Sequence, residues 1–485
     1  MAAPPCQREV AAFLAAITGQ GVVETHISLI FLGETEALKL KKAVDLGFLD
    51  FRSLAERARL TALEQALNAP HAPGLYLGVV PIIRRPDGSL ALGGEGEVLD
   101  WVLRMRRLPP DAFLDAHAPL DPAGLDALAD AVAALHAAAA PRSGDGAMDA
   151  IIAGNRRAAL EAGLDPAAVE AWHAAALARH EALRPWLAAR AAAGFLRRCH
   201  GDLHLGNICL LEGRPTPFDA LEFDEALASI DVGYDLAFLL MDLDRRWGRP
   251  AANRVLNRWV ARSGDAAMVR GLPLWLSLRA MIRAHVAARR GAAEEASGLL
   301  ALAARYLAPP PPRLLAIGGL QGSGKSTLAR ALAPWLGPAP GALVLRSDEI
   351  RKRRAGVAPE QRLPPDRYSP EESAAVMAEL RRMAAEALAA GHAVIADAVF
   401  LREAERTAMA ALHPSFLGIW LEAPIELLRA RIAARQSDAS DADAAVLEAT
   451  AARDPGPILW QRLPADGQAE ERLRKMLDLP AVVSP

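Results

Sequence analysis

The sequence predicts a chain of mixed class in two parts: an α+β part over residues 1–308 and a doubly wound α/β part over residues 313–485. Three observations support this. Four consecutive prolines at 309–312 cannot continue a helix and favour a stiff linker. Before them, about 105 strand-rich residues are followed by about 200 mostly helical residues. After them, short apolar strands alternate with helical segments, which is typical of a parallel sheet covered by helices.

Length and composition narrow the class of protein. The chain has 485 residues, of which 52% are hydrophobic and 23% charged, as in globular proteins rather than disordered ones. The formal net charge of −3 argues against a broad basic surface for nucleic acid or membrane, although it does not exclude a local basic pocket. Three cysteines fit neither a disulfide framework nor a zinc motif. Because no signal peptide or membrane span is recognisable, we expect a cytoplasmic protein without membrane contact.

Hydrophobic spacing predicts the elements of the first part. Alternating apolar residues mark strands, and apolar residues three and four positions apart mark helices. The expected elements are a helix over 8–18, strands over 25–32 and 36–43, a helix over 51–68, strands over 75–83, 90–92 and 99–104, and helices over most of 109–196.

A complete G-x-x-x-x-G-K-[ST] motif occupies 319–326, between an apolar strand over 314–317 and a helix that begins near Lys325. Its glycines let backbone N–H groups point at phosphates, and the helix N-terminus adds partial positive charge. We expect Lys325 to contact the β- and γ-phosphates and the Ser326 hydroxyl to hold Mg²⁺. The residues expected to bind the nucleotide here are Gly319, Gly322, Ser323, Gly324, Lys325, Ser326 and Thr327.

Acidic residues follow two later strands of the second part. A strand over 343–345 leads to Asp348, which suits a general base for an acceptor hydroxyl, and Arg351 lies about one helical turn further on, near the acceptor or the phosphate. A helix N-cap is the alternative role for Asp348. A strand over 393–396 ends at Asp397, a candidate carboxylate for the magnesium site.

Arginines in the second part suggest a lid. A strand over 417–421 leads into a helix over 426–435 that carries Arg429, Arg431 and Arg435. We expect this helix to close over the phosphates, with Arg429 and Arg431 binding the nucleotide. The alternative is a solvated surface helix, and a solvated helix face is likewise the alternative for the basic run 351–354.

With these motifs, the second part resembles the small P-loop kinases, a group that includes gluconate kinase, chloramphenicol phosphotransferase, zeta toxins and the kinase domain of polynucleotide kinase. The resemblance covers about 313–435 and rests on the loop 319–326 and on Asp348-x-x-Arg351. It implies a magnesium-dependent kinase that uses ATP, or GTP as the alternative. In such a kinase Asp348 is the base and Arg351 contacts the acceptor or the phosphate.

A second motif lies in the first part: His200-Gly201-Asp202 with Asn207 five residues after Asp202, followed by Asp219. Phosphoryl transfer needs a carboxylate that accepts the hydroxyl proton, which Asp202 can supply. It also needs oxygen ligands for Mg²⁺, which Asn207 and Asp219 can supply. The spacing is that of protein kinases.

This part resembles the aminoglycoside and choline phosphotransferases, and the segment 231–237 matches a downstream motif of that branch. The resemblance implies a bilobal, protein-kinase-like fold in which the downstream motif supports the catalytic loop by hydrogen bonds. It implies that Lys39 contacts the phosphates, with Lys41 as the second choice. It also implies that this lysine pairs with Glu64, with Glu56 as the alternative.

The first part also departs from the kinase pattern. Residues 25–35 hold no G-x-G-x-x-G loop, and Ala-Leu-Glu222 follows Asp219 where protein kinases have Phe-Gly. Glu222 is a further candidate for assisting the metal or the substrate. No acidic pocket for a cationic antibiotic is recognisable, so the resemblance does not support antibiotic resistance.

The two parts together resemble bacterial proteins that join an aminoglycoside-phosphotransferase-like domain to an AAA-type, zeta-toxin-like P-loop kinase domain. We therefore expect two ATP- and Mg²⁺-dependent sites that phosphorylate alcohol groups of small molecules. One alternative is a single active kinase paired with a regulatory nucleotide- or ligand-binding domain. The other is a polynucleotide 5′-hydroxyl kinase, against which residues 313–485 carry 22 basic and 22 acidic residues. No motif names an acceptor or an oligomeric state.

Overall fold

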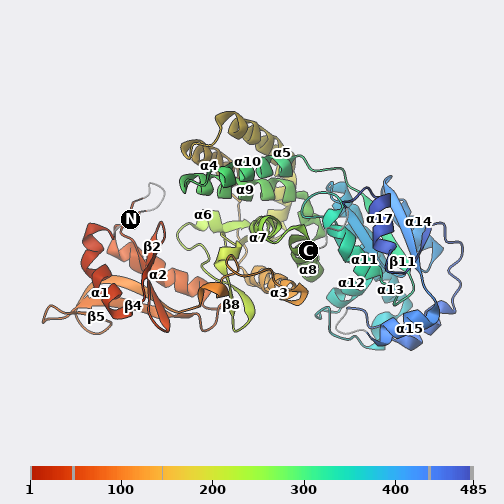
Figure 1. Ribbon diagram of the computed structural model, residues 1–485, viewed down its shortest axis with the longest axis horizontal. Helices are drawn as coiled ribbons and strands as arrows, with labels where there is room; N and C mark the ends of the chain where they lie inside the picture. The colour runs from red at the N-terminus through yellow and green to blue at the C-terminus, as the bar shows by residue number, and fades with distance from the viewer. Residues whose placement is uncertain (1–2, 46–49, 145, 435–438, 481–485) are drawn as a thin grey trace. The chain divides into compact units, whose positions relative to one another are not determined.

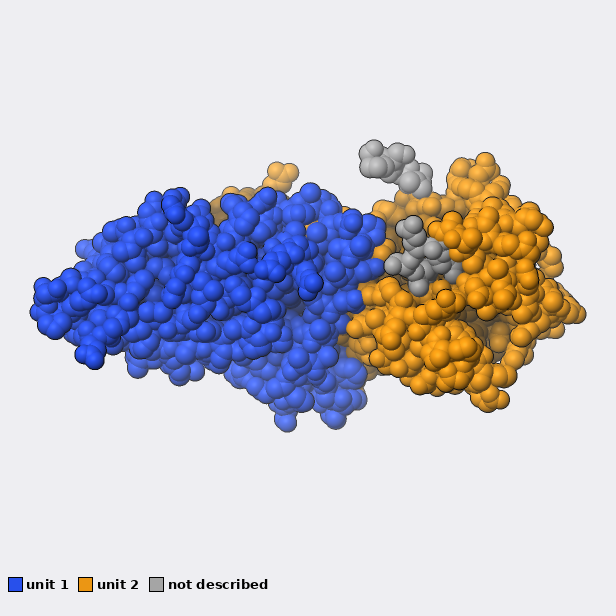
Figure 2. All heavy atoms as spheres, turned by 90° about the horizontal axis from the view of Figure 1, so that it is seen from below, with its two compact units in different colours: residues 1–147, 188–235 blue, residues 148–187, 236–485 orange. Residues whose placement is uncertain are grey.

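The computed structural model describes residues 3–45, 50–144, 146–434 and 439–480. The chain forms two compact units, coloured separately in Figure 2. Unit 1 comprises residues 1–147 and 188–235, and unit 2 comprises residues 148–187 and 236–485. Unit 2 contains helices from both sides of the proline linker, so the compact units do not follow that linker. Arg435 lies outside the described residues.

Unit 1 is built on a six-stranded antiparallel sheet in the order β1-β2-β3-β6-β4-β5 (Figure 1). Five of its strands match expected ones within a few residues, but the short, exposed β1 was not predicted because three residues show no alternation. The elements of this sheet and the two helices beside it are β1 (Val22–Glu24), β2 (Ser28–Leu32), β3 (Glu36–Lys41), β4 (Tyr76–Arg84), β5 (Leu90–Leu92), β6 (Glu97–Arg106), α1 (Arg8–Thr18) and α2 (Leu54–Asn68).

The two faces of β3 have different surroundings. Leu38 and Leu40 pack with α1 and β2 in an apolar cluster that includes Leu14. Because side chains alternate along a strand, Lys39 and Lys41 point to the opposite face. Helix α2, which carries Glu64, lies against β4 and β6 of the same sheet. The pattern Leu-Lys-Leu-Lys thus places two lysines together on the face opposite the apolar cluster.

The remainder of unit 1 surrounds the loop that carries Asp202 and Asn207. The loop, residues 199–207, connects β7 to the antiparallel hairpin of β8 and β9, and β9 leads directly to Asp219. Strand β7 pairs with β10 in a second short antiparallel ladder. The elements here are α3 (Pro122–Ala138), β7 (Leu196–Arg198), β8 (Ile208–Leu211), β9 (Arg214–Pro217), α6 (Glu225–Ala228) and β10 (Ser229–Asp231).

Unit 2 contains a five-stranded parallel sheet in the order β12-β13-β11-β14-β15. Every residue of the central strand β11 is buried, as expected when helices cover both faces of a parallel sheet. The carboxyl ends of β11, β12 and β13 meet at one edge, which is where ligands bind in such folds. The strands are β11 (Leu314–Gly319), β12 (Leu343–Arg346), β13 (Val394–Asp397), β14 (Phe416–Glu422) and β15 (Gln461–Pro464).

Helices surround this sheet. Four of its strands lie where the sequence predicts them. The edge strand β15 was not predicted, because its polar residues show no strand pattern. Helix α15 matches the expected lid helix as far as residue 433. The helices of this part are α11 (Lys325–Leu332), α12 (Ser347–Arg354), α13 (Pro370–Ala389), α14 (Glu403–Ala410), α15 (Ile425–Ala433), α16 (Ala444–Ala451) and α17 (Ala469–Met476).

The remaining helices precede the proline linker. In the part of the chain that the structure describes, none combines the length and apolar character needed to cross a bilayer. They are α4 (Met148–Glu161), α5 (Pro166–Ala192), α7 (Val232–Arg246), α8 (Arg249–Ser263), α9 (Leu272–Arg289) and α10 (Ala293–Leu307).

Helix α8 packs against the edge strand β12. The side-chain amide of Asn257 donates to the Ala342 carbonyl oxygen at 3.2 Å, and the Val344 N–H donates to the Asn257 Oδ1 at 2.6 Å. Asn253 adds a bond of 3.0 Å to the same carbonyl. An edge strand exposes unpaired backbone groups, and here a side-chain carboxamide takes the place of a neighbouring strand. The strand that leads to Asp348 is therefore held by a helix from the other side of the proline linker.

Candidate active sites

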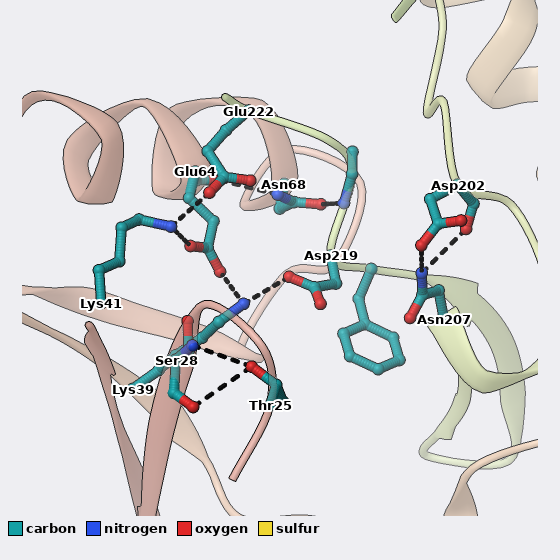
Figure 3. Close-up of polar contacts among 12 residues, drawn as sticks. Thr25, Ser28, Lys39, Lys41, Glu64, Asn68, Asp202, Asn207, Asp219 and Glu222 are labelled. Carbon is teal, nitrogen blue, oxygen red and sulfur yellow. Dashed lines mark hydrogen bonds and ion pairs between the residues drawn. The ribbon is translucent and has the colours of Figure 1, made fainter. Parts of the chain in front are cut away.

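Lys39 connects two acidic residues in unit 1. Its Nζ lies 2.7 Å from Glu64 Oε1 on α2 and 2.6 Å from Asp219 Oδ1 after β9 (Figure 3). Burial raises the pKa of Glu64, but the Lys39 and Lys41 ammonium groups outweigh it and lower the pKa to about 2. Burial likewise opposes the charge of Lys39, yet Asp219 and Glu64 raise the pKa of Lys39 well above its usual value. The structure therefore brings together three residues that the sequence analysis singled out.

The structure also shows where the two alternative residues, Lys41 and Glu56, lie. Lys41 Nζ lies 2.7 Å from Glu64 Oε2 and also contacts Glu222 Oε1. Burial raises the pKa of Glu222, against the effect of Lys41. Glu56 instead pairs with Arg59 on the exposed side of α2, so Glu64 and not Glu56 is the partner of the β3 lysines.

The loop 199–207 brings Asp202 and Asn207 into contact. The Asn207 amide donates to the Asp202 backbone oxygen at 2.9 Å and to its Oδ2 at 3.0 Å. These bonds turn the amide oxygen of Asn207 away from Asp202 (Figure 3). The Asp202 side chain is 42% exposed, so a bound molecule could reach it.

Asp235 supports this loop, as the resemblance predicts. Its fully buried carboxylate accepts from the backbone N–H groups of His200 at 3.1 Å and Gly201 at 2.9 Å. The His200 Nε2–H donates to the Phe218 carbonyl oxygen at 2.8 Å, and burial lowers the pKa of His200, which favours the neutral ring. One imidazole thus joins the Asp202 loop to the residue before Asp219.

Two residues that the sequence analysis missed hold the backbone around Asp219. The Asp219 N–H donates to the Tyr76 hydroxyl at 2.9 Å, and the Ala220 N–H donates to the Asn68 Oδ1 at 2.8 Å. Asp219 has a positive φ of 61°, which a non-glycine residue adopts only when its surroundings enforce it. Asn68 follows Glu64 by four residues and so shares its helix face, a signal that the sequence offers. No sequence pattern marks Tyr76.

The glycine-rich loop of unit 2 has the shape of a phosphate cradle. Lys325 Nζ donates to the carbonyl oxygens of Gly319 and Leu320, each at 2.9 Å. Gly319, with φ of 131°, has no room for a side chain, since an added Cβ would lie 2.5 Å from the Leu421 oxygen. The buried Ser323 Oγ has no hydrogen-bond partner within the described residues. An unpartnered donor inside a loop of this geometry fits a bound anion.

The candidate metal side of this loop centres on Asp397. Ser326 Oγ donates to Asp397 Oδ2 at 2.6 Å, and Arg346 Nε lies 3.3 Å from the same oxygen. Arg346 directly follows the predicted strand, but nothing in its neighbourhood marks it as a partner of Asp397. Within the described residues, no three His, Cys, Asp or Glu side chains form a metal cluster. Each candidate site instead combines a carboxylate with an amide or hydroxyl, which suits an ion shared with phosphates.

A cavity of about 1270 Å³ extends from the glycine-rich loop to the candidate acceptor residues. Asp348 lines it, and burial raises the pKa of that carboxyl. Arg346 is the N-cap of α12, so the capping alternative for Asp348 does not hold. Arg351 also lines the cavity, and its guanidinium lies 4.7 Å from the centre of the Tyr368 ring. Thr327 and the residues of the loop from 322 onward line the other end.

The structure separates the two candidate lid arginines. Arg431 lines the cavity and donates to the Ala465 carbonyl oxygen at 3.0 Å. Arg429 is half exposed and pairs with Glu448 at 2.9 Å. The expectation that both face the nucleotide is therefore revised, because residues two apart lie on opposite sides of a helix.

A further missed residue is Asp441, which follows α15. Its Oδ2 accepts from Lys352 Nζ at 2.6 Å, from the Tyr368 hydroxyl at 2.6 Å and from the Leu363 N–H at 2.9 Å. Asp441 thereby joins α12 to the segment 363–368 on one side of the cavity. No spacing in the sequence points to it.

Family models match both parts of the chain. The model of the phosphotransferase enzyme family matches residues 52–280, and the model of an AAA domain matches residues 314–455. An uncharacterized protein of Mycobacterium tuberculosis (strain H37Rv) is 30% identical, over 93% of this chain and 93% of that protein.

Solved structures with similarity to one part of the chain have also been found. An aminoglycoside phosphotransferase is 15% identical, with a TM-score of 0.37, over 62% of this chain and 97% of that one. A sugar kinase from Janibacter is 20% identical, with a TM-score of 0.29, over 35% of this chain and 96% of that one.

Proposed function

The chain belongs to the same family as the Mycobacterium tuberculosis protein and joins a phosphotransferase-family domain to an AAA domain, and we propose that each domain transfers a phosphoryl group from a nucleotide to a small molecule. The donor is ATP, with GTP as the alternative, and the acceptor group is a hydroxyl. The two sites act on one small molecule in series or on separate acceptors.

The contact of Lys39 with both Glu64 and Asp219 carries the proposal. These residues lie 25 and 180 positions from Lys39 in the chain, and yet both carboxylates reach its ammonium group. Structural stability does not require this, because a buried charged cluster is generally no more stable than an apolar one. The cluster does supply what phosphoryl transfer needs: a cation for the phosphates and a carboxylate for the metal.

In unit 1, Asp202 accepts the proton of the acceptor hydroxyl as the acceptor oxygen bonds to the γ-phosphorus and the nucleoside diphosphate leaves. Asp202 is exposed enough to meet a substrate, and the Asn207 amide orients its Oδ2. The Asp235 carboxylate and the His200 ring keep the loop in place. Lys39 holds the phosphates once it has exchanged Asp219 for them.

In unit 2, Asp348 is the corresponding base. Its raised pKa brings the carboxyl closer to working pH, which makes it a stronger proton acceptor. Arg351 lies one turn further along α12. Its Nη1 donates to the Arg367 carbonyl oxygen at 2.7 Å and its Nη2 to the Ser373 hydroxyl at 3.3 Å, whereas its Nε has no hydrogen-bond partner in the described part of the chain. A planar guanidinium fixed against Tyr368 suits an acceptor that carries an anionic group as well as the reacting hydroxyl.

The donor sets fit a magnesium–nucleotide complex. In unit 1 the oxygens of Asn207 and Asp219 would hold the ion, and in unit 2 Ser326 and Asp397 would lie beside it. Hydroxyl, amide and carboxylate oxygens are the ligands that Mg²⁺ accepts together with phosphate. When bound, the ion neutralises the charge of the phosphates.

The internal pairing of basic residues favours a small acceptor over a polynucleotide. Arg353 pairs with Glu379, Arg354 with Glu372, and Lys352 with Asp441. The run 351–354 therefore leaves little positive charge for a nucleic-acid backbone. A polynucleotide acceptor would show itself by a steep loss of binding with added salt.

The test is label transfer from γ-phosphate-labelled ATP with Mg²⁺ into a mixed pool of cell metabolites and short RNAs. The wild-type chain, Asp202→Ala and Lys325→Ala are compared side by side. We expect each substitution to abolish a different labelled product, because each removes the catalytic or phosphate-binding residue of one site.

Other outcomes contradict the proposal in different ways. If only Lys325→Ala matters, the phosphotransferase domain is a sensor and the two-site proposal fails. If label is released only as inorganic phosphate, the chain is a nucleotide-driven switch rather than a kinase. Labelled RNA that disappears on addition of salt would identify a polynucleotide acceptor.

A further inference from the structure

A second ion pair lies beside Lys39. Lys41 follows Lys39 by two residues on β3, and its Nζ contacts both Glu64 Oε2 and Glu222 Oε1 (Figure 3). The side chains are almost fully buried, with exposed fractions of 1% for Lys41, 1% for Glu64 and 5% for Glu222. Phosphoryl transfer needs one lysine at this place, and Lys39 already fills that role. The Lys41–Glu222 pair therefore calls for a separate explanation.

Glu222 ends a short segment that is held at four consecutive positions. The N–H groups of Asp219, Ala220 and Leu221 donate to Tyr76, Asn68 and His200, at 2.9, 2.8 and 2.9 Å. The Glu222 side chain supplies the fourth attachment, to Lys41. Asp219 thus lies at one end of a segment whose other end is attached to β3 by an ion pair.

Lys41 also shares the Glu64 carboxylate with Lys39. The two lysines contact different oxygens of this carboxylate, Lys39 at Oε1 and Lys41 at Oε2. The pairs form one chain of alternating charges, in the order Asp219, Lys39, Glu64, Lys41, Glu222. A change of charge at Glu222 therefore alters how strongly the Lys39–Asp219 pair at the other end is held together.

Lys39 must leave Asp219 when metal and nucleotide bind, because both the ion and the phosphates need the groups that now pair. As long as Lys41 engages Oε2, Glu64 offers Lys39 one oxygen only. If Glu222 were neutral, Lys41 would bind Glu64 more strongly. Lys39 would then bind Glu64 less strongly and Asp219 more strongly. The Lys39–Asp219 pair would then compete better against the metal ion.

We propose that Lys41 and Glu222 are positioning residues of the unit 1 site, which keep Glu64 and the Asp219 segment in place and let Lys39 exchange Asp219 for phosphate. This inference rests on the proposed function of the same site. It differs from the expectation that Glu222 touches metal or substrate, because Glu222 acts here through Lys41 and Glu64.

The test measures binding of a fluorescent ATP analogue to the full chain carrying Lys325→Ala, which disables the second site. Magnesium is titrated at pH 8 with the analogue held constant. Glu222→Gln keeps the shape of the side chain and removes its charge. We expect it to raise the Mg²⁺ concentration for half-maximal binding about tenfold, while analogue binding without Mg²⁺ changes less than twofold.

A double variant separates positioning from mere stability. Lys41→Met/Glu222→Gln leaves Glu64 with Lys39 as its lysine partner, so Lys39 relies less on Asp219. We expect the Mg²⁺ requirement to return to within twofold of the parent chain, although the single variant raised it. A purely structural role predicts that the double variant is at least as impaired as Glu222→Gln, and that result would overturn the proposal.

Asp100→Asn is the matched control. It removes the charge of another buried pair of the same lobe, Arg57–Asp100, in which Arg57 is on α2 as Glu64 is. We expect a loss of stability in urea but a Mg²⁺ requirement within twofold of the parent chain. If Asp100→Asn raises the requirement as much as Glu222→Gln, the proposal fails.

The proposal and the proposed function fail in distinguishable ways. If the Lys325→Ala chain does not bind the analogue, or if adding Lys39→Met leaves binding unchanged, the proposed function of this site is wrong and the inference fails with it. If the parent chain binds and Glu222→Gln matches it, only the role of Lys41 and Glu222 is refuted.

Discussion

The two candidate sites hold the lysines proposed to bind phosphate in different ways. Lys39 in unit 1 is held by the carboxylates of Glu64 and Asp219, which come from separate elements. Lys325 in unit 2 rests on the carbonyl oxygens of Gly319 and Leu320, six and five residues before it. The first arrangement is a network of side chains made by tertiary packing, and the second is a local loop of backbone. We therefore expect the first site to respond to changes of charge and the second to changes of backbone shape.

The largest effect is expected for Gly319→Ala in the glycine-rich loop. The added Cβ would lie 2.5 Å from the Leu421 backbone oxygen, which has little freedom to move. Label transfer that depends on Lys325 should fall at least about 100-fold, in line with losing several hydrogen bonds to phosphate. It is measured in a chain carrying Asp202→Ala, which isolates the second site.

Gly298→Ala is the control for Gly319→Ala. Gly298 is in α10, and an added Cβ there meets nothing within 4 Å. Transfer should stay at the parent level. If Gly319→Ala is equally harmless, the second site does not depend on backbone shape and the contrast between the sites is wrong.

Lys39→Met tests the other half of the comparison. It leaves the buried Glu64 with Lys41 as its lysine partner and removes a cation from the partly buried Asp219. We therefore expect a loss of unfolding free energy above ~1 kcal/mol but below the about 3–5 kcal/mol of a buried charge left without a partner. Urea unfolding followed by circular dichroism measures the loss. The exposed pair Arg59–Glu56 is the control, and Arg59→Ala should cost less than ~1 kcal/mol. Equal losses of unfolding free energy for the two variants would show that the buried network stabilises the fold no more than an exposed ion pair does.

Asn257→Leu asks whether the second site is held by local backbone alone. The substitution leaves the Val344 N–H without its partner, and an unsatisfied buried donor costs about 1–3 kcal/mol. The Val344 amide should exchange its hydrogen faster in Asn257→Leu than in the parent chain. Arg258→Ala, on the same helix, should leave the exchange rate of that amide unchanged. Unchanged exchange in Asn257→Leu would mean that α8 does not support β12.

The smallest effect is expected from pH. Burial raises the pKa of Asp348, so the base is protonated and lost as pH falls through a value above the ~3.9 of a free aspartate. Transfer by the second site should therefore decline on acidification before an ordinary aspartate would titrate. The rate is measured from pH 8 downward in the Asp202→Ala chain. A rate that stays constant down to pH 4 would rule out Asp348 as the base.

Residues that act through their immediate neighbours could be predicted from the sequence. The loop 319–326 shapes itself from its glycines and the helix that follows, so its residues were recognisable together. The support of the loop 199–207 by the segment 231–237 was also predicted, and two hydrogen bonds from backbone N–H groups of the loop to Asp235 confirm it. Periodicity could place α2 and β3 as well, because alternation and helical spacing depend on neighbours only.

Choices among similar residues were settled only by the packing. The resemblance named Glu64 first, with Glu56 on the same helix as the alternative, and the packing of α2 against the sheet confirms that Glu64 meets the lysines. Arg429 and Arg431 differ in the same way, since the direction in which α15 faces decides which one lines the cavity. The roles of these residues remain predictions that the experiments above address.

The sequence by itself determined the two motifs, most of the elements that present them, and the side of β3 on which both lysines lie. These follow from local rules of spacing and backbone geometry. Only the tertiary structure decided that Lys41 shares Glu64 with Lys39 and reaches Glu222, that Tyr76 and Asn68 hold the Asp219 segment, and that Asn257 completes the edge of the second sheet. Each of these contacts joins residues far apart in the chain, and their meeting depends on how whole elements pack.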